Sequence, residues 1–164
     1  SVLSVPRPPR PGEKPFSAPL PGFDDAGLVF IGRLRSPFAP RDDCPKNRRA
    51  ALEAGAAGRL EVDRPFREAL VGLLPGDHVF CLSWLDGAAR DLALQKPRHA
   101  ETARGTFSLR SPVRPNPIGL HLVRIEALDI EAGLVSIDAI DVVDGTPLLD
   151  IKPYHGSVDR PQEG

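Results

Sequence analysis

The segment from Gly105 to Gly119 holds two arginines and an asparagine among closely spaced prolines. Each proline fixes its own φ angle and lacks a backbone donor, so the segment loses little further entropy when it becomes ordered. Arg110 and Arg114 therefore project from a stiffened loop, and a guanidinium can hold a carboxylate or phosphate through two parallel hydrogen bonds. This pattern indicates an anion-binding loop. A second interpretation is that the prolines end a strand and both arginines pair with surface acids.

A turn further along the chain is the second place where chemistry could occur. Asp144-Gly145 is followed by Thr146-Pro147, so a carboxylate, a hydroxyl and the amides of a turn come together. Such a group could hold a ribose or an amino group. A plain hairpin turn would have the same sequence, because Asp-Gly turns are common in β proteins.

Short β-rich segments must position these two groups. The run 78–85 is apolar on both faces, as in a central strand of a closed sheet, and Trp84 is predicted to lie in the core. The alternation in 134–142 slips at Ile140, which predicts a bulge. The sequence lacks Rossmann and P-loop fingerprints and a βαβ rhythm. We therefore predict a mainly β protein, a closed antiparallel β-barrel of about six or seven short strands with one or two short helices. The expected strands are 28–35, 59–62, 78–85, 105–109, 120–128, 134–142 and 148–151, and the expected helices lie within 44–58 and 65–71.

The composition predicts a soluble protein with a single folded core. The 164 residues carry a formal net charge of −1, and 41% are apolar, which suffices for a core without disulfides or a structural metal. Cys44 and Cys81 have no partner at metal-ligand spacing, so no metal is expected and a reducing, cytoplasmic setting is favoured. The apolar runs are much shorter than the about 20 residues that span a membrane, so no membrane association is expected.

Two regions depart from this average. Residues 1–22 are rich in proline and arginine and have too little apolar surface to fold alone, so we expect an extended arm there. We assign 23–156 to the barrel domain and 157–164 to a C-terminal tail. The stretch 96–114 is basic and 126–164 is acidic. These could be two solvated faces of a neutral protein or the walls of an anion-binding cleft.

Three segments, in order and spacing, resemble the TsaA-like or TrmO-type family. The resemblance extends from about Leu28 to Tyr154. Its motifs in this sequence are Ile31-Gly32-x-x-x-Ser36-Pro37-Phe38, Gly105-x-Phe107-Ser108-x-Arg110-Ser111-x-x-Arg114-Pro115-Asn116-Pro117-Ile118-Gly119 and Asp144-Gly145-Thr146-Pro147-x-x-Asp150-Ile151-Lys152-Pro153-Tyr154.

The resemblance implies a methyltransferase that uses S-adenosylmethionine, has a β-barrel core and works as a homodimer with its cofactor pocket near the subunit interface. Members of the TrmO type methylate N6 of threonylcarbamoyladenosine beside the tRNA anticodon, so tRNA is the expected partner. The family often has His-Gln at 86–87 and Arg-Gln-Pro-Gly at 46–49, and this chain departs from both patterns. The implied cofactor contacts are Arg110, Leu120, Asp144, Gly145, Thr146 and Pro147, with Asp86, Gly87, Asn47, Arg48 and Arg49 at the departing positions.

Methyl transfer is an in-line displacement in which orientation of the reactants supplies much of the acceleration, so it needs no covalent nucleophile. The absence of a Cys-His or Ser-His-Asp signature is consistent with such a reaction. We expect Asn116, Asp150 or Tyr154 to orient the adenine nitrogen or to accept its proton. The expected substrate contacts are Arg114, His121 and Lys152.

Longer bacterial members of the family have an additional C-terminal domain thought to help bind tRNA, whereas this sequence stops about ten residues after Tyr154. RNA would then be recognised by the arm, by the basic stretch 96–114 and by a second subunit. The alternative hypotheses are a regulatory or interaction module that binds S-adenosylmethionine without methylating tRNA, and a methyltransferase with a different acceptor.

Overall fold

A computed structural model describes residues 7–19, 26–39 and 44–163 of the chain. The contacts divide the chain into two compact units. The smaller unit comprises residues 1–27 and 85–119, and the larger unit comprises residues 28–84 and 120–164. Each unit has its own β-sheet.

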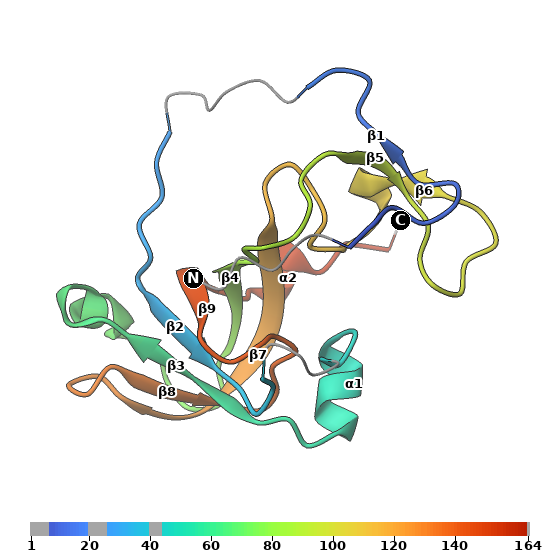
Figure 1. Cartoon of the computed structure of the whole chain (residues 1–164). Coiled ribbons are helices and arrows are strands. Elements are labelled where there is room, and N and C mark those ends of the chain that lie inside the picture. Colours follow the sequence, from blue (N-terminus) through green and yellow to red (C-terminus); the bar gives the residue numbers. More distant parts are fainter. Residues whose placement is uncertain (1–6, 20–25, 40–43, 164) are drawn as a thin grey trace. The chain divides into compact units, whose positions relative to one another are not determined.

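The larger unit is a closed antiparallel barrel of six strands (Figure 1), which confirms the predicted fold class. Strand β9 pairs with β2 on one side and with β4 on the other, so it closes the sheet. In order around the barrel the strands are β2 (Gly32–Arg35), β3 (Gly58–Val62), β8 (Leu134–Ile137), β7 (Ile118–Asp129), β4 (His78–Trp84) and β9 (Thr146–Pro153).

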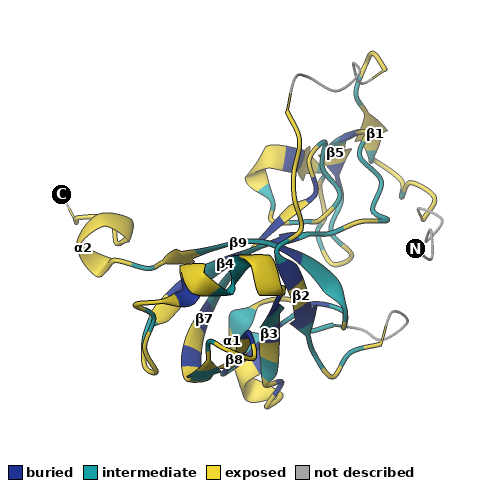
Figure 2. Ribbon diagram, turned by 90° about the vertical axis from the view of Figure 1, so that its left-hand side faces the viewer, coloured by how far each residue is buried: buried dark blue, intermediate teal, exposed yellow. Residues whose placement is uncertain are grey.

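The barrel core consists of the alternate residues of each strand, visible as dark bands along the ribbons in Figure 2. In β4, Val79, Cys81 and Ser83 are fully buried, and the residues between them are partly exposed. Trp84 lies on that second face and is only partly buried, so its predicted place in the core is wrong. Other core side chains are Leu34, Leu60, Val62, Val123, Ile125, Val135, Ile137 and Leu148.

Short helical segments connect the barrel strands. The predicted helix within 44–58 is α1 (Arg48–Glu53), and the side chain of Asn47 caps it by accepting a hydrogen bond from the backbone nitrogen of Ala50 at 2.9 Å. The helix expected at 65–71 is the 3-10 helix η1 (Arg64–Leu70), and α2 (Gly156–Asp159) follows β9. None of the helices in the described part of the chain is long and apolar enough to cross a membrane.

The smaller unit contains a three-stranded sheet with the order β1 (Lys14–Pro15), β5 (Leu92–Gln95) and β6 (Arg104–Gly105). Buried polar groups hold it together. The Thr106 hydroxyl, in the 3-10 helix η2 (Thr106–Ser108), accepts a hydrogen bond from Gln95 Nε2 at 2.9 Å and donates one to the carbonyl of Leu92.

Within residues 7–19, Lys14 and Pro15 pair with β5, which differs from the extended arm that the composition predicted. The Glu13 side chain has no exposed surface; it pairs with Arg7 at 2.6 Å and accepts hydrogen bonds from the backbone nitrogens of Arg10 and Lys96. Polar contacts with backbone, rather than apolar burial, hold the segment, so its low hydrophobicity gave no sign of them. Residues 1–6 and 20–22 of the predicted arm lie outside the described residues, and the proposed domain boundaries stay predictions.

Two predicted strands differ from the structure. The strand expected from Leu28 begins only at Gly32, and Leu28 and Val29 are exposed. The strand expected over 105–109 is wrong, because β6 ends at Gly105 and the chain turns into η2.

The bulge predicted at Ile140 is also absent, because β8 already ends at Ile137. Ile140 and Val142 are nevertheless buried. Residues two positions apart are therefore buried in irregular backbone, which gives the same sequence pattern as a strand. Register irregularities of the barrel lie instead in β7, between Ile125 and Ala127, and in β4, between Leu82 and Ser83.

Candidate functional site

The turn at Asp144-Gly145 leads into β9 and is held by backbone contacts with the region of β2. Asp144 N–H donates to the carbonyl of Phe38 at 2.7 Å, and Gly145 N–H donates to that of Leu34 at 2.9 Å. Gly145 has a φ of +83°, which favours glycine. Since β8 and β9 are not neighbours in the barrel, the alternative of a plain hairpin turn is wrong.

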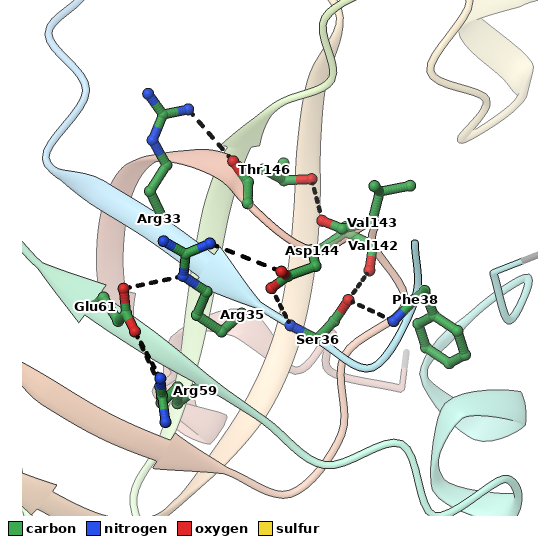
Figure 3. A network of polar contacts seen from close by, with 11 residues as sticks. Arg33, Arg35, Ser36, Phe38, Arg59, Glu61, Val142, Val143, Asp144 and Thr146 are labelled. Carbon is green, nitrogen blue, oxygen red and sulfur yellow. Dashed lines mark hydrogen bonds and ion pairs between the residues drawn. The ribbon is translucent and has the colours of Figure 1, made fainter. Parts of the chain in front are cut away.

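The carboxylate of Asp144 belongs to a polar network on the barrel exterior (Figure 3). One of its oxygens accepts a hydrogen bond from Ser36 N–H at 3.1 Å, and the other lies 3.7 Å from Arg35 Nη1. Arg35 also bonds Glu61 at 3.0 Å, and this bond lowers the pKa of the Glu61 carboxyl below its ordinary value. The Asp144 side chain remains 44% exposed, so the network fixes it without covering it.

An open depression of about 830 Å³ adjoins this network on the larger unit. Its walls carry guanidinium groups of Arg35 and Arg59 and the carboxylates of Glu61, Glu126 and Asp144. Charges of both signs suit a ligand that itself carries both signs. The sequence analysis missed Arg35, Arg59 and Glu61; the charged residues that alternate with other residues in β2 and β3 were the available signal.

The proline-rich loop of the smaller unit uses its two arginines differently. Arg114 Nη1 donates to the backbone carbonyls of Leu109 at 2.8 Å and Ser111 at 3.0 Å, so this side chain braces its own loop. Arg110 is exposed and makes no side-chain hydrogen bond or ion pair with a described residue. Neither arginine pairs with an acidic residue among the described residues, so the interpretation in which both pair with surface acids is wrong.

The predicted cofactor residues near α1 have local partners. Asn47 caps the helix, and Arg48 forms two hydrogen bonds with Asp138, at 3.0 Å and 2.7 Å. Arg49 pairs with Glu53 at 3.2 Å on the exposed side of the helix. Of the three, only Arg49 presents a largely exposed charge.

The remaining predicted cofactor residues lie in a turn after β4, in β7 and at the start of β9. The Asp86 carboxylate accepts a hydrogen bond from Gly87 N–H at 2.8 Å, and Gly87 has a φ of +90°, so this pair forms its own turn. Leu120 in β7 is a partly exposed apolar side chain. Thr146 donates to the carbonyl of Val143 at 2.6 Å, which further fixes the Asp144 turn.

Two of the predicted catalytic residues lie along β9 and just beyond it. Asp150 pairs with Lys152 at 3.2 Å and lines a second, more apolar depression of about 580 Å³. The Tyr154 ring meets the ring of Phe80 edge-on, with 5.8 Å between the ring centroids. The third, Asn116, is exposed in the loop of the smaller unit.

Both ring nitrogens of His121, a predicted substrate contact, have partners inside the protein, and its substrate role stays a prediction. Nε2 lies 2.7 Å from the Ser83 hydroxyl, and Nδ1 lies 2.9 Å from an oxygen of Asp141. The sequence analysis missed this Ser-His-Asp group, because its members are far apart in the sequence and match no spacing motif. Among the described residues, no cluster of three His, Cys, Asp or Glu side chains could hold a metal ion.

The predicted site residues are therefore divided between the units. The smaller unit carries Asp86, Gly87, Arg110, Arg114 and Asn116. The larger unit carries Asn47, Arg48, Arg49, Leu120, His121, Asp144, Gly145, Thr146, Pro147, Asp150, Lys152 and Tyr154.

Comparison with known proteins relates residues 33–160 to the model of a family described as the tRNA-methyltransferase O N-terminal domain. The chain is 40% identical over 134 residues to the "Probable S-adenosyl-L-methionine-binding protein VirR" of Rhizobium radiobacter, a match that covers 82% of this chain and 74% of that protein. It is 34% identical over 165 residues to the human tRNA (adenine(37)-N6)-methyltransferase, covering 94% of this chain and 36% of the human protein.

A solved structure gives the same relationship. The crystal structure of TrmO from Pseudomonas aeruginosa matches with a TM-score of 0.66 and 34% sequence identity. That match covers 86% of this chain and 61% of the TrmO chain, so the similarity concerns part of the longer protein.

Proposed function

The chain belongs to the TrmO family, and from this premise we propose that it is an S-adenosylmethionine-dependent methyltransferase acting on an adenosine of tRNA. The family match carries the proposal, because residues 33–160 include both the arginine loop and the Asp144 turn. The proposed acceptor is N6 of threonylcarbamoyladenosine beside the anticodon. A relative named as a tRNA (adenine(37)-N6)-methyltransferase supports this choice.

The residues present offer chemically suitable groups for S-adenosylmethionine. The exposed guanidinium of Arg110 suits its carboxylate, and the accessible carboxylate of Asp144 suits ribose hydroxyls. The apolar side chain of Leu120 suits one face of the adenine. We propose these three as its principal contacts, with Gly145, Thr146 and Pro147 providing the backbone of the turn.

When bound, S-adenosylmethionine supplies a methyl group on a positively charged sulfur. This chain must then orient the acceptor nitrogen and take up its proton. Asp150 is the proposed proton acceptor, because its carboxylate lies on β9, the strand that the Asp144 turn leads into, and borders the more apolar depression of about 580 Å³. Tyr154, fixed against Phe80, and Asn116 are the proposed groups that orient the adenine.

The basic stretch 96–114 is the proposed contact with tRNA. Arg98 and Arg104 are exposed and can meet phosphates, and Phe107 is 76% exposed, so a base could stack on its ring. The proposal includes a homodimer as the working form and a cytoplasmic location, where both cysteines would stay reduced; neither is in a disulfide.

The first experiment titrates the full chain with S-adenosylmethionine in a calorimeter. Arg110→Ala should weaken binding by about 10- to 100-fold, the loss expected for one charged hydrogen bond. Arg98→Ala removes an exposed arginine of the same unit and should leave the affinity unchanged. Absence of binding by the unsubstituted chain at millimolar ligand would contradict the proposal.

The second experiment separates methylation from binding alone. A module that only binds S-adenosylmethionine is the other candidate, and the name of the Rhizobium radiobacter relative favours it. Mass spectrometry of tRNA from a strain lacking the gene should show loss of the N6-methylated nucleoside, and the intact gene should restore it. If the tRNA nucleoside is unchanged and the chain still binds S-adenosylmethionine, two hypotheses remain: a module that only binds S-adenosylmethionine, or a methyltransferase with another acceptor.

A further inference from the structure

A chain of three polar side chains joins two barrel strands to an irregular loop. Ser83 belongs to β4, His121 to β7 and Asp141 to the segment 138–145 that follows β8. The Ser83 hydroxyl lies 2.7 Å from His121 Nε2, and His121 Nδ1 lies 2.9 Å from Asp141. All three residues lie in the larger unit.

The chemistry of the partners assigns the protons. An ionised Asp141 can only accept hydrogen bonds, so His121 Nδ1 carries a proton and donates it. In the neutral ring Nε2 is then an acceptor, and the Ser83 hydroxyl donates to it. Every polar atom of the imidazole is therefore used inside the protein, and the orientation of the ring is fixed.

Burial excludes a hydrolytic role for this group. Ser83 has a relative exposure of 0%, and the His121 side chain is only 9% exposed. A substrate cannot reach the serine oxygen, so the same three residue types that make a nucleophile elsewhere can only hold structure here. The Asp141 end is more accessible, at 21% exposure.

The loop that His121 holds is the one that carries the Asp144 turn. Residues 138–145 contain no strand, so their position depends on individual anchors. Ile140 N–H donates to the carbonyl of Ala56, and Asp144 N–H donates to that of Phe38. Between these two anchors the loop has two side-chain contacts: His121 bonds Asp141, three residues before Asp144, and the Ser36 hydroxyl donates to the carbonyl of Val142.

We propose that His121 is a positioning residue for the cofactor turn: by bonding Asp141 it fixes the loop 138–145, and Ser83 fixes the ring that makes this bond. The inference rests on the proposed function, because the Asp144 turn is a cofactor contact only under that proposal. The same histidine also fixes β7 directly after Leu120, the proposed apolar contact.

Two substitutions of His121 separate this role from simple packing. In His121→Asn the side-chain amide can take the place of Nδ1 and donate to Asp141, whereas in His121→Gln the amide reaches toward Ser83 instead. We expect His121→Asn to bind S-adenosylmethionine within about threefold of the unsubstituted chain, and His121→Gln about tenfold more weakly, as for one lost charged hydrogen bond. If only packing mattered, the order would be reversed, because glutamine fills more of the volume of histidine.

A second measurement does not depend on the cofactor. Hydrogen exchange of the backbone amides in 139–145 should be faster in His121→Gln and in Asp141→Ala than in the unsubstituted chain, and nearly unchanged in His121→Asn. The same two substitutions at the exposed His99 are the matched control and should alter neither exchange nor affinity.

The two measurements fail in different ways. If the unsubstituted chain does not bind S-adenosylmethionine, the proposed function fails, whereas exchange still tests whether His121 holds the loop. If the unsubstituted chain binds but the two His121 variants show equal affinity or the reversed order, the positioning role is overturned. Equal exchange in 139–145 for all variants would overturn it as well.

Discussion

The barrel is stabilised internally by one kind of contact, and the smaller sheet is stabilised internally by another. In the barrel, inward side chains such as Leu34 and Ile125 are fully buried around one apolar core. In the smaller sheet, no strand exceeds four residues, and the buried Gln95 and Thr106 hydrogen-bond with each other and with backbone. Apolar alternation therefore predicts structure where a sheet closes on its own core, and fails where polar side chains replace that core.

The largest effect on stability is expected from a substitution that creates a cavity in the barrel core. Leu34→Ala should lower the free energy of unfolding by about 3 to 4 kcal/mol, because the fully buried side chain leaves a void that the closed sheet cannot fill. Urea denaturation followed by circular dichroism measures the change. Leu94→Ala, at a partly exposed position of β5, should lower it by less than about 1 kcal/mol. Similar losses for both variants would show that the barrel core is not the main source of stability.

The same distinction explains what the sequence could predict of the fold. Strands β4, β7 and β9 follow from the β-rich apolar runs at 78–85, 120–128 and 148–151, and α1 follows from its composition. The pairing of Lys14–Pro15 with β5 could not be predicted, because the Glu13 carboxylate beside it accepts a backbone hydrogen bond from Lys96, 83 residues away in the sequence. Ile140 misled the prediction of β8, since a buried loop residue and a buried strand residue look alike in a sequence.

The residues of the candidate site could be selected from the sequence only in part. Arg110 and Asp144 could be selected as candidates from their residue types and neighbours, and the structure leaves both side chains accessible; their contact with a cofactor stays a prediction. The role of Arg114 in fixing its own loop could not be predicted, because its hydrogen-bond partners are backbone carbonyls. The bonds of His121 also escaped prediction, since only the closed barrel brings Ser83 and Asp141 to the same ring.

A smaller effect is expected when a buried polar contact of the smaller sheet is removed. Thr106→Val keeps the shape of the side chain but deletes the hydroxyl that bonds Gln95 and the carbonyl of Leu92. We expect a loss of about 1 to 3 kcal/mol, the range for leaving a buried polar group without its partner. Hydrogen exchange of amides in β5 and β6, compared with amides of the barrel strands, measures it. Thr102→Val at an exposed position is the control, and equal exchange in the two variants would argue against a polar core.

The most local effect concerns the attachment of residues 7–19, in which one carboxylate takes part. The hydrogen bond from Arg7, with those from the backbone nitrogens of Arg10 and Lys96, lowers the pKa of Glu13 from 4.5 to about 2. Because the pKa is lower in the folded state, the carboxylate stabilises the segment fully above pH 4.5, and this contribution is lost as the pH falls toward 2. Limited proteolysis of 7–19 should therefore accelerate in that acidic range.

Glu13→Gln decides whether this contact matters at neutral pH. The amide is uncharged and has one acceptor oxygen in place of two, so it cannot satisfy Arg7, Arg10 and Lys96 together. Cleavage of 7–19 should then be fast at pH 7 and lose its acidic dependence, while Glu101→Gln, at an exposed position, should behave like the unsubstituted chain. If Glu13→Gln resists cleavage as well as the unsubstituted chain, backbone pairing of β1 alone retains the segment. If the unsubstituted chain and both variants are cleaved rapidly at every pH, the segment is the extended arm that its proline content predicted. The smaller sheet would then consist of β5 and β6 alone.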